Sequence, residues 1–180
     1  MMILYVLRHG EAVERSEGLS DEWRYLTEQG RADIGKVVER VAEHGHKPRL
    51  ILSSPLVRAV QTAEIAAGRA CRKNRTLVLE QLQPDGDRDE LTRYLLEQKD
   101  VKRVMIVGHE PQLGLLVASL LDRRDPLALK KGSCVALELD IDADETKPAL
   151  AKPATFLWYV VPGKKIMKSL KKAFPGQHAG

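Results

Sequence analysis

Aromatic residues are scarce in this chain, and its apolar runs are short. Phe, Trp and Tyr make up 4% of the sequence, so an interleaved basic and aromatic surface for single-stranded nucleic acid is not expected. The apolar start of the chain, residues 1–7, ends at Arg8 and His9 and is too short to span a membrane. It also lacks the basic start and cleavage site of a signal peptide. These absences predict a cytoplasmic protein with no nucleic-acid partner and no stable membrane insertion.

Cysteine is also rare. Cys71 and Cys134 lie far apart, which argues against a disulfide framework and for a reducing compartment. The 180 residues fit one domain, and the 43% hydrophobic content is ordinary for a globular protein. A formal charge of +4 mildly favours anionic ligands such as phosphates, without selecting one of them.

Strands and helices are predicted to alternate along the chain. Short apolar runs predict strands at 3–7, 50–52, 76–79 and 104–107, and two β-rich runs follow at 134–141 and 155–161. Caps and helical spacing predict helices that begin near Thr27, Pro55, Asp87 and Pro111. The polar stretch 11–25 is long enough to act as a flap. This order predicts an α/β three-layer sandwich, in which helices flank a mostly parallel central sheet.

The end of the chain differs in composition from the rest. We divide the sequence into a domain at 1–162 and a basic tail at 163–180, the latter either a short helix or disordered. The tail carries five lysines, at 164, 165, 168, 171 and 172, and its apolar residues share one helical face. Such a helix can lie on a membrane surface or bind an acidic partner. Packing back on the domain, or fraying, is the simpler interpretation and is preferred.

Residues with chemical uses follow three of the predicted strands, where ligands bind in open α/β sheets. They are Arg8 and His9 after the first strand, Ser53 and Ser54 after the second, and His109 after the fourth. Arg58 lies one turn into the next helix and can lean back toward the same edge.

Two arginines and two histidines suit a phosphoryl group. Guanidinium groups bind phosphate oxygens with two parallel hydrogen bonds and stay charged. A neutral imidazole can be a nucleophile, and two nearby arginines lower its pKa by charge repulsion. A second imidazole can stabilise the charge that develops during transfer. Gly10 lets the backbone approach a ligand closely.

Three segments, in this order along the chain, carry a family resemblance. They are Leu7-Arg8-His9-Gly10-Glu11-Ala12, Ser53-Ser54-Pro55-Leu56-Val57-Arg58-Ala59-Val60-Gln61-Thr62 and Val107-Gly108-His109-Glu110-Pro111. Together they resemble the motifs of the histidine phosphatase superfamily, which includes the phosphoglycerate mutases. Leu26-Thr27-Glu28-Gln29-Gly30 and Leu82-Gln83-Pro84-Asp85-Gly86-Asp87 are similar to elements of its small SixA-type phosphohistidine phosphatases.

The resemblance implies a phosphoglycerate mutase-like fold and a metal-independent reaction without a cofactor. By that implication His9 takes the phosphoryl group, while Arg8, Gly10, Arg58 and His109 bind it, and water then releases it. Larger members use an acidic residue near the third strand as proton donor, and Glu80 and Asp87 are the candidates here. A donor that is hard to place fits a phosphohistidine substrate, because imidazole leaves more readily than an alkoxide.

Three functions remain open. The first is dephosphorylation of phosphohistidine on a protein, such as a histidine phosphotransfer domain, and the short flap favours it because a protein needs an open pocket. The second is a phosphatase or mutase for a small phosphorylated metabolite. The third is a module that binds phosphate or phosphopeptide without turnover, against which the intact His9 argues.

Other phosphate and metal chemistries find little support. His44 and His46 lack further ligands at metal-binding spacing. The acidic runs 85–89 and 140–144 have neither the glycine nor the closing glutamate of a calcium loop. Segment 142–146 is similar to the nucleophile motif of haloacid dehalogenase phosphatases, but too little chain follows it to build that fold. Neither cysteine has an arginine six positions later, and no Gly-Lys-Ser/Thr loop occurs.

Overall fold

A six-stranded sheet forms the middle layer of the protein. The structure is a computed structural model and describes residues 1–70, 76–98, 100–142 and 149–176. The strand order is β3-β2-β4-β1-β5-β6. The strands are β1 Met2–Arg8, β2 Leu50–Ser53, β3 Thr76–Val78, β4 Arg103–Gly108, β5 Cys134–Leu139 and β6 Thr155–Val160. The pairs β1–β4, β2–β4 and β2–β3 are parallel and β5 is antiparallel to both neighbours, so the mostly parallel sheet is confirmed.

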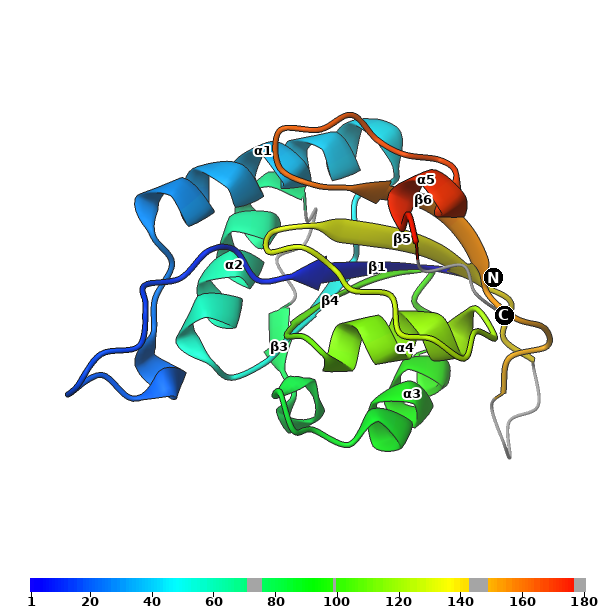
Figure 1. Ribbon diagram of the computed structural model, residues 1–180. Coiled ribbons are helices and arrows are strands. Elements are labelled where there is room, and N and C mark those ends of the chain that lie inside the picture. The colour runs from blue at the N-terminus through cyan, green and yellow to red at the C-terminus, as the bar shows by residue number, and fades with distance from the viewer. Residues whose placement is uncertain (71–75, 99, 143–148, 177–180) are drawn as a thin grey trace.

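Helices cover both faces of this sheet (Figure 1). The helices are α1 Glu28–His44, α2 Val57–Ala70, α3 Arg88–Glu97, α4 Gln112–Leu120 and α5 Leu170–Ala173, with short 3-10 turns η1 Asp21–Trp23 and η2 Glu80–Leu82. In Figure 1, α1 lies above the sheet and α3 and α4 lie below it. The predicted three-layer sandwich is therefore confirmed.

The core divides by strand alternation. Leu4 and Val6 of β1 pack with Leu116 of α4 on one face. Tyr5 and Leu7 face the opposite side, toward α1 and α2. Because successive side chains of a strand point to opposite faces, a strand covered on both sides is apolar at every position. This explains why the sequence showed continuous apolar runs rather than alternating ones.

Two predicted helix caps are confirmed. The Thr27 side chain accepts a hydrogen bond from Gly30 N, 2.9 Å away. Asp87 Oδ1 accepts from the N–H groups of Asp89 and Glu90, at 2.8 and 2.9 Å. Each side chain satisfies backbone donors that the first helical turn leaves without a partner.

The end of the chain packs against β6. Met167 exchanges two backbone hydrogen bonds of 2.9 Å with Tyr159, and the Phe174 ring stacks on the Tyr159 ring at a centroid distance of 4.7 Å. Phe174 and Ala173 are buried. The described part of the tail therefore packs on the domain and includes the short helix α5.

Within the described residues, no helix is long and apolar enough to cross a membrane. Cys71 and most of segment 142–146 lie outside the described residues.

Candidate active site

Two adjacent parallel strands, β1 and β4, bring the predicted histidines together. Arg8 of β1 is paired with Gly108 of β4, so the residues that follow, His9 and His109, leave the sheet side by side. Their rings are 4.9 Å apart between centroids and tilted by 52°. Both are buried, with 7% and 2% of their surfaces exposed. The sheet register, rather than sequence proximity, therefore brings together two histidines from segments 100 residues apart.

His9 is held in one orientation by its neighbour. Its Nδ1 lies 2.7 Å from the carbonyl oxygen of Gly10. A carbonyl can only accept, so Nδ1 carries the proton and Nε2 of the neutral ring keeps a lone pair. Gly10 N in turn donates to Thr62 Oγ1 at 3.2 Å, and Thr62 Oγ1 donates to the carbonyl of Arg58 at 2.7 Å. This chain of hydrogen bonds connects the β1 loop to α2.

Close backbone contact at Gly30 fixes the same loop from the other side. A Cβ atom on Gly30 would lie 2.2 Å from the carbonyl oxygen of Glu11. No larger residue fits there without displacing the backbone. Together with the Thr27 cap, this contact gives a structural reason for the Leu26–Gly30 element of the sequence.

Arg58 lies on the first turn of α2 and is 4% exposed. Its Nη1 donates to the carbonyl oxygen of Asp21 at 2.6 Å, and its Nη2 donates to Asp21 Oδ2 at 2.8 Å. Asp21 also accepts from Arg24 and Arg15, at 2.9 and 3.1 Å. Partial burial would raise the pKa of Asp21, but the hydrogen bonds from Arg24 and Arg58 hold that pKa well below its usual range. The flap is therefore fastened to a site arginine by an ionised carboxylate.

These flap residues were missed by the sequence analysis, which used only the length of the stretch 11–25. The spacing of Asp21 and Arg24, opposite charges three residues apart, was a local signal. It gave no indication that their partner is Arg58, 37 residues away.

Arg8 approaches the site from the α4 side of the sheet. Its Nη1 donates to the carbonyl oxygen of Leu129 at 2.6 Å. Burial lowers its pKa, whereas the charge of Glu110 opposes that shift. Glu110 is itself partly buried, and burial raises its pKa to about 7 although Arg8 and the backbone N–H groups of Leu129 and Gly114 favour its ionised form. Like Asp21, Glu110 interacts electrostatically with a site arginine, and the sequence did not suggest this interaction.

Both histidines are neutral at physiological pH. Burial, followed by the charges of Arg58 and Arg8, lowers the pKa of His9 to about 4, against the opposing hydrogen bond to Gly10. Burial, His9 and Arg58 lower the pKa of His109 to about 3, although Asp21 opposes this. The predicted depression of the His9 pKa by two arginines is correct in sign, but desolvation is the larger cause.

His109 has one partner and one open nitrogen. Its Nε2 lies 2.8 Å from Ser54 Oγ, and Ser54 Oγ accepts from Leu56 N at 3.3 Å. Among the described residues, three buried nitrogens of the site have no hydrogen-bond partner: Nε of Arg8, Nε of Arg58 and Nδ1 of His109. Buried polar atoms are normally paired, so these three atoms are suited to an anionic ligand.

The two proton-donor candidates, Glu80 and Asp87, are both exposed and hydrogen-bonded within their own segments. Asp87 is exposed, and one oxygen of its carboxylate caps α3. Glu80 is also exposed and accepts a hydrogen bond from the Gln83 side chain. In the part of the chain that the structure describes, no group of three His, Cys, Asp or Glu side chains could hold a metal ion.

Comparisons with known proteins point to one family. The model of the histidine phosphatase superfamily (branch 1) matches residues 4–82. An uncharacterized protein of Picosynechococcus sp. is 36% identical over 115 residues, covering 63% of this chain and 69% of that protein. Phosphohistidine phosphatase SixA of Escherichia coli is 28% identical over 147 residues, covering 81% of this chain and 90% of SixA.

A solved structure agrees with this result. The protein histidine phosphatase SixA complexed with tungstate has a TM-score of 0.77 and 27% identity, and the match covers 89% of this chain and 97% of that one. Three observations support the same family: the sequence matches, the shared fold, and the paired histidines at the ends of β1 and β4. The chain belongs to the histidine phosphatase superfamily.

Proposed function

We propose that this protein is a phosphatase that forms a phosphohistidine on His9 and removes phosphate from phosphohistidine in a protein substrate. The observation that carries the proposal is the pair of neutral, buried imidazoles, 4.9 Å apart between ring centroids, beside three buried nitrogens without partners among the described residues. Fixed cationic and N–H donors around a neutral nucleophile favour attack on a phosphoryl group over mere storage of an anion.

The first step is a displacement at phosphorus. The hydrogen bond from His9 Nδ1–H to the Gly10 carbonyl, 2.7 Å long, directs the lone pair of Nε2 away from the backbone. Nε2 forms the new P–N bond while the P–N bond to the substrate imidazole breaks, and the leaving imidazole takes up one proton from solvent. Water then attacks phosphorus, the P–N bond to His9 breaks, and inorganic phosphate leaves with His9 neutral again.

Each of the other site residues has a role in this scheme. The guanidinium groups of Arg8 and Arg58 bind phosphoryl oxygens and neutralise their charge. When the Ser54 hydroxyl donates to Nε2 of His109, Nδ1 of that neutral ring carries the proton and can donate to the same oxygens. Gly10 allows the loop backbone to pass close to the ligand.

The substrate class rests on the leaving group. The Asp87 carboxylate caps a helix, and the Glu80 carboxylate accepts a hydrogen bond from Gln83. Neither is therefore positioned as a general acid for the leaving group. An imidazole leaving group needs less protonation than an alkoxide does. Two relatives named phosphohistidine phosphatase SixA or SixA homolog support this choice, and a SixA structure that resembles this chain was solved with tungstate, an oxyanion of phosphate-like shape.

The cellular setting is part of the same proposal. Cys134 is a buried free thiol, which is typical of proteins in a reducing compartment. We place the protein in the cytoplasm, with a phosphorylated protein such as a histidine phosphotransfer domain as its partner.

A turnover comparison tests the proposal. Initial rates are measured for a phosphohistidine protein, a phosphoserine peptide and a sugar phosphate, each with wild type and His9→Ala. We expect the phosphohistidine protein to have the highest kcat/KM, by at least about tenfold, and His9→Ala to be inactive on all three. A preference for the sugar phosphate would assign the enzyme to small metabolites instead. Full activity of His9→Ala would exclude His9 as the nucleophile.

A further inference from the structure

A second concave region adjoins the active site through Arg8. We call it the basic hollow: a pocket of about 650 Å³ lined by Arg8, Lys130, Lys164, Lys165 and Lys172, with an apolar floor that includes Tyr159, Met167 and Phe174. It lies where β1 and β6 end and β5 begins, the same sheet edge as His9. The volume is typical of specific ligand sites.

The floor of the basic hollow is firmly built. Tyr159 is buried, and its hydroxyl accepts from Lys130 N at 3.0 Å. Met167 pairs with Tyr159 through the backbone, and Phe174 stacks on it. These contacts join β6 to the tail, so the apolar floor exists before any ligand binds.

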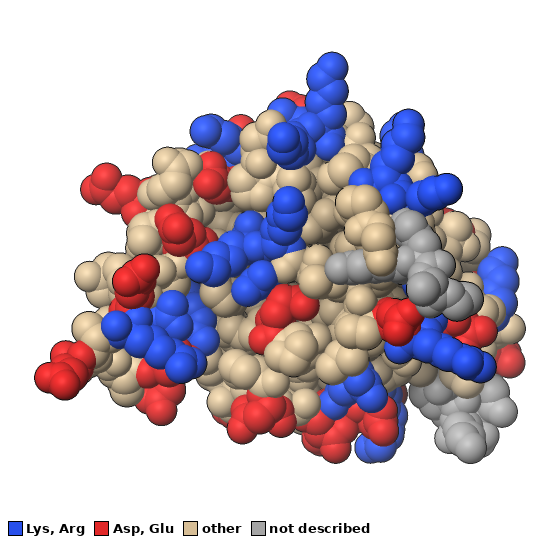
Figure 2. All heavy atoms as spheres, in the orientation of Figure 1, with Lys and Arg blue, Asp and Glu red and all other residues tan. Residues whose placement is uncertain are grey.

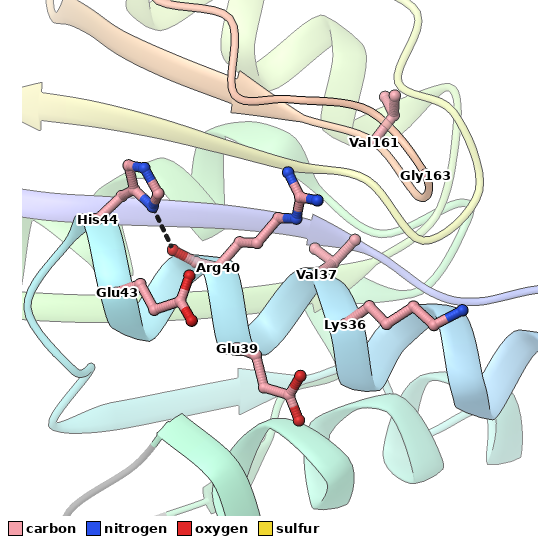
Figure 3. A pocket seen from close by; sticks show the side chains of 8 residues that line it. All are labelled: Lys36, Val37, Glu39, Arg40, Glu43, His44, Val161 and Gly163. Carbon is pink, nitrogen blue, oxygen red and sulfur yellow. Dashed lines mark hydrogen bonds between the residues drawn. The ribbon is translucent and has the colours of Figure 1, made fainter.

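The wall formed by the loop after β6 is also anchored. Arg40 of α1 donates from Nη1 to the carbonyl oxygen of Lys164 at 2.8 Å. Figure 3 shows Arg40 reaching from α1 toward this loop, near Gly163. The anchor fixes the backbone of Lys164 while leaving its ammonium group in solvent.

The charge of the basic hollow has one sign. Five of its lining residues are cationic, and among the described lining residues none is acidic. All four lysines are exposed. Figure 2 shows Lys and Arg side chains over the upper part of the same face, around α5 and β6, whereas along its left and lower edges Asp and Glu alternate with further Lys and Arg. A ligand of this surface is therefore anionic around an apolar centre.

The pocket drawn in Figure 3 provides a contrast. It has a volume of about 310 Å³ and its lining includes Lys36, Glu39, Arg40 and Glu43. Its charges of both signs offset one another, and it contains none of the proposed active-site residues. Charge of one sign and contact with Arg8 distinguish the basic hollow from this pocket.

We propose that the basic hollow docks an acidic segment of the phosphorylated protein, with one large apolar side chain on the Tyr159–Met167–Phe174 floor and carboxylates at the lysines. The inference rests on the proposed function, because the segment must belong to the substrate whose phosphohistidine reaches His9. Lys168, next in the chain to Met167 of the floor, is also exposed, and a protein segment can reach such a charge outside the pocket more readily than a small metabolite can. Docking raises the local concentration of the phosphoryl group beside Arg8.

Charge reversal with a matched control tests docking. The double variant Lys164→Glu/Lys172→Glu alters the hollow, and Lys36→Glu/Lys102→Glu makes the same charge change at exposed lysines elsewhere. For each, kcat/KM is measured with an acidic phosphohistidine protein, with phosphoramidate and with 1-naphthyl phosphate, and folding is checked by thermal melting. We expect the protein-to-phosphoramidate ratio to fall about tenfold in the hollow variant only, more at low salt.

Three results would overturn the proposal. Equal ratios in the hollow variant and the control would show that the lysines do not dock protein. An equal loss with phosphoramidate would assign them to the phosphoryl group itself. A loss with 1-naphthyl phosphate as large as that with protein would assign the floor to small aromatic phosphates.

A binding assay separates this inference from the proposed function. A fluorescent peptide of Asp and Glu around one Phe, without phosphate, should bind wild type and lose about tenfold in affinity for the hollow variant. If wild type binds the peptide but hydrolyses no phosphohistidine protein, the proposed function fails while the docking site stands. If wild type does not bind the peptide, the docking site is wrong whatever the enzyme hydrolyses.

Discussion

The protein has two cationic regions at one edge of its sheet, and they are built in opposite ways. Near His9 the cationic side chain of Arg58 is buried: it is 4% exposed, and each of its Nη atoms donates a hydrogen bond to Asp21. In the basic hollow the lysines are exposed and lie over an apolar floor. Arg8 is the residue that both regions share.

Burial determines whether a cationic side chain acts on the chemical step or on substrate association. A buried guanidinium with fixed hydrogen bonds needs no reorganisation when charge develops in the transition state, so it acts on the chemical step. An exposed ammonium is screened by salt and acts mainly on association. If substitutions of buried and of exposed cationic residues changed the kinetic constants alike, this distinction would be wrong.

Among the variants that keep His9, the largest effect is expected for Arg58→Ala. Loss of this buried cation should reduce kcat by roughly 10²–10³-fold, the range for single groups that stabilise transition-state charge. Arg58→Lys should recover little, because an ammonium cannot make two parallel hydrogen bonds. Steady-state kinetics on phosphoramidate measures both.

Arg69→Ala is the matched control for Arg58. It removes an exposed arginine of the same helix that forms an ion pair with Glu39, and should leave kcat within about twofold of wild type. Near-normal activity of Arg58→Ala would remove Arg58 from the active site.

Stability should depend on pH in a way that reports the buried site. His9 and His109 have pKa values near 4 and 3 in the folded protein, below the unfolded value of about 6.5. The unfolded chain therefore binds more protons between these values, and stability rises as pH increases from about 4 to 6.5. Glu110, with a folded pKa of about 7, acts in the opposite sense, so its contribution falls as pH increases from about 4.5 to 7.

Glu110→Gln separates the two effects. Relative to wild type, the free energy of unfolding of this variant should increase between pH 4.5 and 7 by at least about 1 kcal/mol. Urea denaturation at several pH values measures it. A difference that stays constant with pH would show that Glu110 is ionised alike in the folded and unfolded states.

Asp21→Ala should have an intermediate effect. It removes the carboxylate that fastens the flap to Arg58 but leaves the bond from Arg58 to the Asp21 carbonyl. We expect kcat/KM for phosphoramidate to fall roughly threefold to tenfold, which corresponds to the net contribution of one ordinary hydrogen bond, about 0.5–1.5 kcal/mol, because the second bond to Arg58 remains. Glu22→Ala, in the same turn, is the control, and equal losses in the two variants would contradict a specific role for Asp21.

The smallest effect is expected for Arg40→Ala. It frees the loop that carries Lys164 and Lys165 without altering their charge. The protein-to-phosphoramidate ratio should fall by about twofold, since one exposed hydrogen bond contributes at most about 1 kcal/mol. A loss as large as that of the lysine reversal would mean that loop position, and not charge, controls docking.

The sequence predicted the layers because their signals are local, and it suggested the candidate site residues from the ends of strands and, for Arg58, from the family motif. Arg8, His9 and His109 follow apolar runs directly, and Arg58 lies one turn into a helix that begins after another such run. The flap carboxylate Asp21 and the buried Glu110 were not predicted. Their roles depend on contacts with Arg58 and with Leu129, which no periodicity or spacing encodes.

The basic hollow was predicted only in part. The five lysines of the tail were visible in the sequence, and so was the apolar face of the tail helix. Their juxtaposition with Arg8 and Lys130 depends on β6 lying two strands from β1. Strand order of that kind follows from the packing of the whole sheet, not from one segment.

The most direct test of the account locates the phosphoryl group on the enzyme. Wild type and His9→Ala are mixed with a phosphohistidine protein, quenched with base within milliseconds, and digested for mass spectrometry. We expect a phosphorylated peptide with the modification on His9, destroyed by acid and missing from His9→Ala. Phosphate on any other residue, or hydrolysis by His9→Ala at the wild-type rate, would contradict it.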